Sequence, residues 1–170
     1  MPMLLDIRDT VADYAELIAR VVGVDVEVVD AGLNRLAGTG LYASGVGENI
    51  RAEGETYRHV MRIRSSFVME TPREHFICTR CPGRDLCRET LSISTPIIDG
   101  SDVLGVIGLV CSTDEDRARV LGHKDVYVQF IERCAEFILH KLHDHADLLR
   151  ARSFLDIMLR ILEINSRGIV

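Results

Sequence analysis

Apolar residues recur at intervals of three and four near both ends of the chain. Residues 3–22 follow this spacing and are followed by Gly23, and the same spacing continues without glycine or proline over residues 124–165. The apolar face of the first segment consists of Ile7, Val11, Ala15, Ile18 and Val22. Such spacing gathers side chains on one face of a helix, and a glycine directly after it is a common helix end. The chain is therefore predicted to begin and end in helices.

The middle of the chain contains short runs of alternating or β-branched apolar residues, which are typical of strands. These runs are 24–29, 35–39, 67–69, 91–98 and 103–111. The last two surround Asp99-Gly-Ser-Asp102, a strong hairpin signal, and residues 103–111 are apolar on both faces, as expected of a central strand. Two further helices are predicted at 52–64 and 113–121, where Thr113 is a candidate N-cap. The predicted fold class is α+β, with an antiparallel sheet flanked by helices and followed by a long C-terminal helix.

The C-terminal helical pattern carries a stripe that one helix cannot bury by itself. Its members are Ile131, Cys134, Ile138, Lys141, His145, Leu148, Arg152, Leu155, Leu159 and Leu162. The polar or charged residues at 141, 145 and 152 weaken the middle of this stripe, a pattern found in coiled coils that transmit signals. We therefore expect residues 123–165 to be a dimerising signalling helix in a parallel homodimer.

Composition and charge exclude several classes of protein. The 170 residues are 47% hydrophobic, which is enough for one ordinary domain and an additional element. No run approaches the ~20 apolar residues of a membrane helix, and the first residues lack the features of a signal peptide. The net charge of −6, with scattered basic residues, disfavours direct nucleic-acid binding. We expect a cytoplasmic protein that contacts neither membrane nor nucleic acid.

Three of the five cysteines, Cys78, Cys81 and Cys87, lie within ten residues of one another. Two cysteines separated by two residues direct their sulfur atoms toward one point. Pro82-Gly83 then supplies a turn that returns Cys87 to the same place. Cys111, at the end of a predicted strand, is the best candidate for a fourth ligand. The sequence thus predicts a metal centre held by cysteines.

The spacing of these cysteines favours an iron–sulfur cluster over zinc. Three close cysteines and one distant cysteine are common around a cubane 4Fe-4S cluster, whereas structural zinc usually takes two cysteine pairs. Zinc and a redox-active or unligated dithiol remain as alternatives, because cytoplasmic thiols stay reduced. A thiol oxidoreductase using Cys78 and Cys81 is the weaker alternative, since this pair does not begin a helix after a strand.

Other residues, near this segment and far from it, bear on the ligand set. Four arginines are expected to lower the thiol pKa values and offset the charge of a ligated centre: Arg73, Arg80, Arg84 and Arg88. His75 is a reserve ligand, and Cys134 is expected to be a buried apolar residue on the helical stripe. His140, His143 and His145 are expected on solvated surface. No catalytic nucleophile or acid–base pair is recognised, so the chain is not expected to be an enzyme.

Several segments together resemble a known family. They are Val22–Asp30, Arg35–Gly40, the pattern His75-x-x-Cys-x-x-Cys-x-x-Arg-x-x-Cys87, Pro96-Ile97 and Gly105–Cys111. These segments resemble the N-terminal sensory region of bacterial sigma-54-dependent transcription activators (enhancer-binding proteins), which is built on a GAF- or PAS-like domain. The resemblance implies a metal centre on Cys78, Cys81, Cys87 and Cys111. It also implies that a PAS domain, an ATPase domain and a DNA-binding helix-turn-helix follow in the full-length protein.

Two hypotheses for function follow. In the first, a 4Fe-4S cluster on the four cysteines senses redox state or a small gas, and the dimer helix carries the signal onward. In the second, the domain binds a small molecule and zinc is only structural. The pocket of this second sensor would be lined by Tyr42, Tyr57, Met61 and Phe67.

The same observations predict the domain organisation. Residues 1–122 are expected to form the GAF/PAS-like sensory domain, with a metal-site loop at 75–87. Residues 166–170 are expected to begin a truncated downstream domain. The chain is therefore expected to be a fragment of a longer protein.

Overall fold

The computed structural model describes the backbone of residues 2–167 and their side chains, except those of 154, 158 and 160–167. The elements are η1 (Leu4–Ile7), α1 (Arg8–Val22), β1 (Asp25–Asp30), β2 (Arg35–Gly38), η2 (Gly40–Gly45), α2 (Glu55–Ile63), β3 (Phe67–Met69), η3 (Phe76–Arg80), η4 (Arg84–Leu86), β4 (Leu91–Asp99), β5 (Asp102–Cys111), α3 (Asp114–Leu121) and α4 (Lys124–Arg167), where η denotes a 3₁₀ helix. Every strand and α-helix predicted from the sequence is present. The 3₁₀ turns were not predicted.

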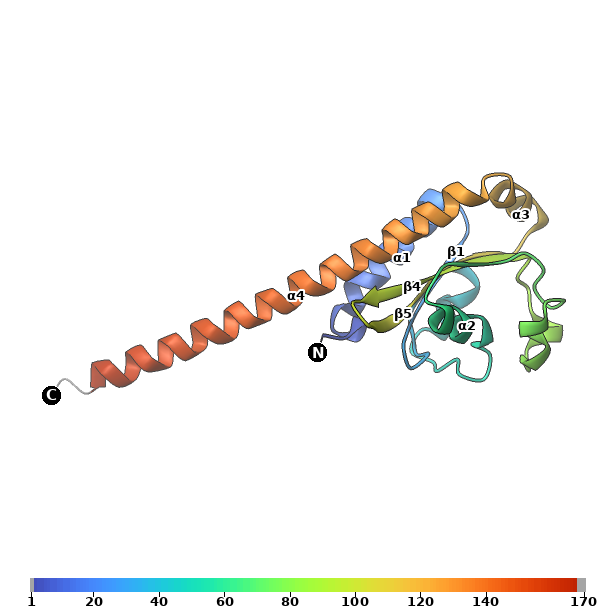
Figure 1. Ribbon diagram of the computed structural model, residues 1–170. Helices are drawn as coiled ribbons and strands as arrows, with labels where there is room; N and C mark the ends of the chain where they lie inside the picture. The colour runs from blue at the N-terminus through green and yellow to red at the C-terminus, as the bar shows by residue number, and fades with distance from the viewer. Residues whose placement is uncertain (1, 168–170) are drawn as a thin grey trace.

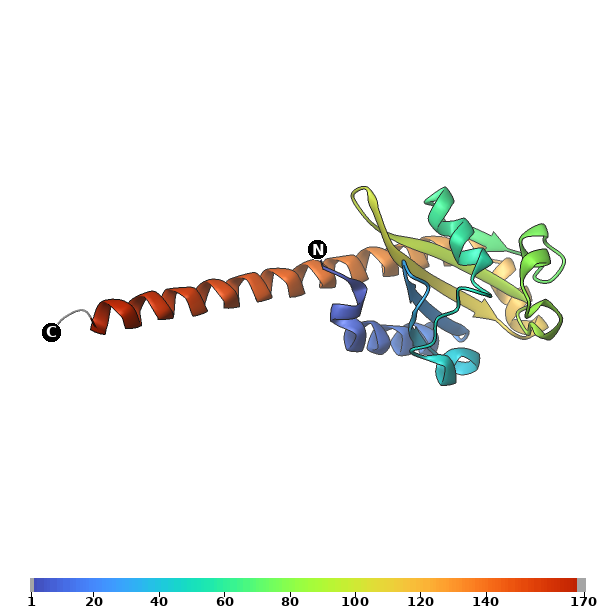
Figure 2. The same cartoon turned by 90° about the horizontal axis from the view of Figure 1, so that it is seen from below.

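The five strands form one antiparallel sheet in the order β2-β1-β5-β4-β3. The hairpin of β4 and β5 pairs from Leu91 opposite Cys111 to Asp99 opposite Asp102. β5 lies between β4 and β1, which confirms the prediction of a central strand. Figures 1 and 2 show this sheet with helices on both faces, and the α+β prediction is confirmed.

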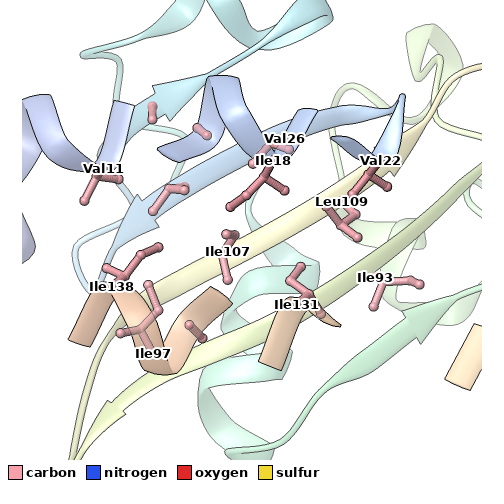
Figure 3. Packing of buried hydrophobic residues seen from close by; sticks show 14 of the residues in the cluster. Val11, Ile18, Val22, Val26, Ile93, Ile97, Ile107, Leu109, Ile131 and Ile138 are labelled. Carbon is pink, nitrogen blue, oxygen red and sulfur yellow. The ribbon is translucent and has the colours of Figure 1, made fainter. Parts of the chain in front are cut away.

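The two faces of the sheet are covered differently. α1 and the first half of α4 lie side by side over one face, and α2 lies on the opposite face (Figure 1). The main hydrophobic core fills the space beneath α1 and α4, where Ile107 and Leu109 of β5 meet Val11, Ile131 and Ile138 (Figure 3). A smaller cluster around Val29, Val60 and Val106 lies beneath α2. The two clusters follow the alternation of side chains along each strand.

α4 is partly a component of this core and partly a projection beyond it. Ile131 and Ile138 are 0% and 1% exposed against the chain's own sheet. The prediction that they belong to a seam for a partner helix is therefore wrong, because the sheet of the same chain covers them. Leu148, Leu155 and Leu159, further along α4, are 68%, 60% and 59% exposed. Their part of the predicted seam stays without a partner in the single chain.

Two predictions concern residues near the end of α4: the stripe residue Leu162 and the start of a downstream domain at residues 166–170. The side chain of Leu162 lies outside the described residues, as does the backbone of residues 168–170. Residues 166 and 167 are the end of α4. The predicted start of a downstream domain therefore lies largely outside the described part of the chain. Within residues 2–167, no helix combines the length and apolar character needed to cross a membrane.

Local signals at the ends of the helices act as predicted. Gly23 ends α1 with φ of 72°, in the left-handed region that glycine adopts without steric cost. The Thr113 hydroxyl accepts a hydrogen bond from the Asp116 amide at 3.1 Å and caps α3. α3 therefore begins directly after β5 and leads into α4.

Candidate functional site

Two short 3₁₀ turns position the three clustered cysteines. Cys78 lies in η3 and Cys81 directly follows it, with the Cys81 amide donating to the Cys78 carbonyl at 3.1 Å. Cys87 directly follows η4, and its amide donates to the Arg84 carbonyl at 3.3 Å. The turns fold the segment back on itself, as the Cys-x-x-Cys spacing and Pro82 predicted. His75 caps η3, since its Nδ1 accepts from the Ile77 amide at 3.3 Å.

All three cysteines line one cavity of about 110 Å³. The cavity lies between η3, η4, α2 and the face of the sheet that α2 covers, and we call it the cysteine cavity. Its wall also includes Glu27, Arg35, Tyr42, Ile50, Glu53, Gly54, Glu55, Thr56, Tyr57, Met69, Pro72, Ile77, Glu89 and Ser92. The structure therefore brings Cys78, Cys81 and Cys87 together, as the sequence predicted.

Cys111 is not brought to this cavity. It lies on β5 with Ile107 and Leu109 and belongs to the core beneath α1 and α4, where it is 2% exposed. Alternate residues of a strand point to opposite faces of a sheet, so this face is the one turned away from the three other cysteines. Only the backbone of Cys111 approaches the cysteine segment, because its carbonyl accepts from the Thr90 amide at 2.8 Å.

Burial, rather than the surrounding arginines, has the largest effect on the pKa values of Cys81 and Cys87. Burial raises the pKa of Cys81 and of Cys87 above the usual thiol value, and the carboxylate of Glu89 adds to both shifts. The expectation that arginines lower these pKa values is therefore wrong. Arg84 instead donates from Nε to the Arg73 carbonyl at 2.6 Å. Metal binding at these thiols would accordingly release protons.

Beneath the cavity, the sheet carries a buried ion pair that the sequence analysis missed. Glu27 is 2% exposed, and its Oε1 accepts from Arg35 Nε at 2.6 Å. Tyr57 donates its hydroxyl to the other oxygen of Glu27. The sequence reading took Glu27 as a polar position alternating with valines. Glu27 lies opposite Gly38, and Arg35 reaches the same face only because a β-bulge at Val28 and Val29 shifts the register, so the sequence offered no direct signal for this pair.

Tyr42 links the wall of the cavity to this ion pair. The Tyr42 hydroxyl donates to Glu89 Oε1 at 2.6 Å, and the Tyr42 ring lies 5.3 Å from the Arg35 guanidinium carbon. Burial raises the pKa of Glu89, against the opposing effect of the Tyr42 hydrogen bond. Tyr42 and Tyr57 therefore line the cavity, as the second hypothesis predicted. Met61 and Phe67 instead pack at the edge of the smaller hydrophobic cluster.

Within the described residues, no three His, Cys, Asp or Glu side chains are already arranged around a single metal ion. A tetrahedral zinc with Zn–S distances of about 2.3 Å would draw its sulfur ligands to within about 4 Å of one another. A cluster spreads its irons apart and accepts more widely spaced thiols. The wall of the cavity carries three thiols, which are donors that either centre can use.

The residues set aside as ligands lie elsewhere. Cys134 is partly buried between α1 and α4, and burial raises its pKa to about 11. His143 Nε2 lies 2.9 Å from Asp99 Oδ2 at the surface. Neither residue lies at the cysteine cavity, which agrees with the sequence prediction.

Comparison with known sequences gives one informative relative, while no protein-family model matches the chain. Over 140 residues, or 82% of its length, the chain is 28% identical to a sigma-54-dependent transcriptional regulator of Escherichia coli strain K12 whose name connects it with uric acid. The aligned part is 24% of that regulator. The chain thus spans about a quarter of the length of this relative.

Comparison with solved structures identifies the fold. A GAF domain/HD domain protein from Geobacter sulfurreducens superimposes with a TM-score of 0.56 at 15% identity, covering 82% of this chain and 95% of that one. The nlh2 GAF domain of A. aeolicus in an inactive state gives a TM-score of 0.57 at 14% identity, covering 81% and 84%. The GAF domain of a phosphoenolpyruvate-protein phosphotransferase from Coxiella burnetii gives 0.55 at 14% identity, covering 90% and 86%. The chain is a GAF-fold domain related to a sigma-54-dependent transcriptional regulator, as its sequence motifs indicated.

Proposed function

We propose that this chain is the sensory part of a sigma-54-dependent transcriptional regulator and that the cysteine cavity holds its metal centre. The observation that carries this proposal is the convergence of Cys78, Cys81 and Cys87 on one cavity. The Escherichia coli relative supports the regulatory role. The ATPase and DNA-binding domains of such a regulator would belong to the rest of the full-length protein.

The size of the cavity supports a small inorganic occupant. Pockets for organic ligands usually measure about 300–1,000 Å³, whereas the cysteine cavity measures about 110 Å³. The name of the relative connects that regulator with uric acid. Uric acid is a purine, and the cysteine cavity would have to open to admit an organic ligand of that kind.

The donor set fits a 4Fe-4S cluster in three of the four ligands expected from the sequence. Cys78, Cys81 and Cys87 would supply thiolates, while Cys111 faces the opposite side of the sheet. When bound, the cluster would supply the response to redox state or to a small gas. Zinc on the same thiols is the alternative, and it would make the cavity a structural support rather than a sensor.

An arginine of α3 offers a route from the cavity to the long helix. Arg117 Nε donates to the Thr90 carbonyl at 3.1 Å, and an Arg117 Nη donates to the Glu70 carbonyl at 3.0 Å. These two carbonyls flank the cysteine segment on either side. Lys124, at the start of α4, pairs with the Glu70 carboxylate at 2.9 Å. A change in the shape of the segment would thus reach α3 and the start of α4, which lie at the same end of the molecule as the segment (Figures 1 and 2).

Replacing Arg117 with alanine is expected to leave metal binding intact and to weaken its coupling to α4. In the unsubstituted chain, hydrogen exchange near residues 113–130 should change when the metal is removed. If Arg117 contributes about 0.5–2 kcal/mol to the coupling, its loss should reduce the metal-dependent change in the hydrogen-exchange rate by about 2–30-fold. Arg150→Ala is the control, because Arg150 pairs with Asp147 on the exposed surface of α4, far along the helix from α3. An unchanged metal-dependent difference in Arg117→Ala would contradict this route.

The proposal includes a homodimer, and a groove between α1 and α4 supports it. The groove measures about 400 Å³ and its exposed surface is almost entirely apolar. Leu17, Val21 and Phe137 on its walls are 58%, 69% and 49% exposed. Leu148, Leu155 and Leu159, further along α4 beyond the sheet, are exposed as well. The same pair of helices from a second copy would cover both surfaces at once.

Leu17→Glu is expected to convert the dimer to a monomer. A charge in the centre of an apolar interface cannot be paired, so the dimer dissociation constant should rise by about 100-fold or more. Analytical ultracentrifugation over a range of concentrations measures this. Ile63→Glu is the matched control, because Ile63 is 39% exposed on α2 and faces away from the groove. A monomeric unsubstituted chain at micromolar concentration would refute the dimer.

The metal centre itself is tested by anaerobic purification. Visible absorption should be measured together with iron, acid-labile sulfide and zinc in the same sample. A brown protein with about four iron and four sulfide per chain supports the cluster. A colourless protein with about one zinc per chain supports the structural alternative. A protein with neither metal contradicts the proposed function.

A further inference from the structure

We infer that Glu89, rather than Cys111, supplies the fourth ligand of the centre in the cysteine cavity. This inference rests on the proposed function, because it concerns the same metal site. It follows from which donor atoms reach the cavity and which of them are already engaged. The thiol of Cys111 lies beneath α1 and α4, and the cavity lies on the other face of the sheet.

Bringing Cys111 into the cavity would disrupt the central strand. On β5, Val110 pairs with Asp25 of β1, and Cys111 itself pairs with Leu91 of β4. Turning one side chain to the other face shifts the register of the strand end by one residue. The 2% exposed thiol would also leave the hydrophobic core. A ligand already on the cavity wall requires neither change.

The wall of the cavity offers carboxylates besides its three thiols. They are Glu27, Glu53, Glu55 and Glu89. Both oxygens of Glu27 are engaged, one by Arg35 and one by Tyr57. Glu55 pairs with Arg58 at 2.6 Å within the first turns of α2. These two carboxylates therefore already have cationic or hydroxyl partners.

Glu89 is half-buried and has a free donor atom. Oε1 accepts from the Tyr42 hydroxyl at 2.6 Å, and among the described residues Oε2 takes part in no hydrogen bond. Glu53, by contrast, is exposed to solvent on the loop before α2. Glu89 follows Cys87 by two residues, so the same segment carries both. A ligating carboxylate is typically held by a hydrogen bond to its second oxygen, which is the role that Tyr42 fills.

A carboxylate ligand would give the centre one position unlike the others. Oxygen is a harder donor than thiolate sulfur and binds iron–sulfur centres less strongly. The Glu89 position would therefore be the one at which a small molecule could replace a protein ligand. Tyr42 would retain the displaced carboxylate beside the cavity. The structure thus assigns to Glu89 the role of the exchangeable ligand, and to Tyr42 the role of holding its carboxylate.

The experiment compares metal retention in four forms of the chain purified anaerobically. Iron and sulfide per chain are measured, and then the rate at which a ferrous chelator removes iron. Glu89→Gln should lose iron at least about tenfold faster than the unsubstituted chain, since a ligand has been replaced by a neutral amide. Cys111→Ala should retain iron at the unsubstituted rate. Tyr42→Phe keeps the carboxylate but removes the hydrogen bond that holds it, so its rate of iron loss should lie between those of the unsubstituted chain and Glu89→Gln.

The results distinguish a failure of this inference from a failure of the proposed metal centre. Iron retention by Glu89→Gln, or iron loss by a folded Cys111→Ala, overturns the inference while leaving the metal centre in place. Absence of both iron and zinc from the unsubstituted chain overturns the proposed function and the inference together. Circular dichroism verifies folding, and Cys111→Val, which refills the core, serves if the alanine variant unfolds. Glu89→Cys should restore slow iron loss, which a purely structural role for Glu89 does not predict.

Discussion

Cys81→Ser is expected to remove most of the metal from the chain. Cys81 lies between the two 3₁₀ turns, where its thiol opens onto the cavity with those of Cys78 and Cys87. A serine hydroxyl stays protonated at neutral pH and is a poor ligand for iron or zinc. Losing one ligand of such a centre should reduce metal per chain by about tenfold or more after a chelator wash. Metal analysis of the purified variant provides the measurement.

The matched control for this substitution is Cys134→Ser. Cys134 lies between α1 and α4, away from the cavity. Its substitution should therefore leave the metal content unchanged. Cys78→Ser and Cys87→Ser are expected to behave as Cys81→Ser does. Equal metal content in Cys81→Ser and Cys134→Ser would show that the cavity cysteines do not hold the centre.

Arg35→Ala is expected to destabilise the fold by about 3–5 kcal/mol. Arg35 is 9% exposed and pairs with Glu27, which is 2% exposed beneath the cysteine cavity. Removing the guanidinium leaves a buried carboxylate without its cation, and the Tyr57 hydroxyl alone compensates only part of that charge. Chemical unfolding of the metal-free chain measures the change. Working without metal separates the stability of the fold from that conferred by binding.

Two comparisons make this prediction specific. Arg58→Ala removes a more exposed pair with Glu55 and should cost no more than about 1 kcal/mol. Adding Glu27→Gln to Arg35→Ala should recover part of the lost stability, because the buried charge is then neutral. A cost of Arg35→Ala similar to that of Arg58→Ala would mean that the buried pair contributes little.

The sequence predicted the elements of this fold well, because their signals are local. The alternation in β1 and the turn before β5 each lie within a few residues of the strand they define. β5 was also predicted as the central strand, since it is apolar on both faces. The family resemblance was confirmed by a relative and by GAF-fold structures, even though the identities are low.

The predictions that failed concern which element covers a given face. Ile131 and Ile138 have the spacing of a coiled-coil seam, and the same spacing serves a helix that packs on its own sheet. Cys111 lies at the end of a predicted strand, but the sequence does not reveal which face of the sheet the three clustered cysteines cover. The pKa values of Cys81 and Cys87 likewise depend on burial, and the number of arginines nearby in the sequence does not predict burial. Glu89 carried no signal because a glutamate in a loop is ordinary.

The most direct measurement is cysteine-resolved alkylation, read by mass spectrometry, of the anaerobically purified chain before and after chelation. If the cysteine cavity holds the centre, Cys78, Cys81 and Cys87 are protected in the metal-bound chain and become modified once the metal is removed. Cys134 should react equally in both samples, because it lies between α1 and α4. Equal modification of the three cavity cysteines with and without the chelator would contradict the account.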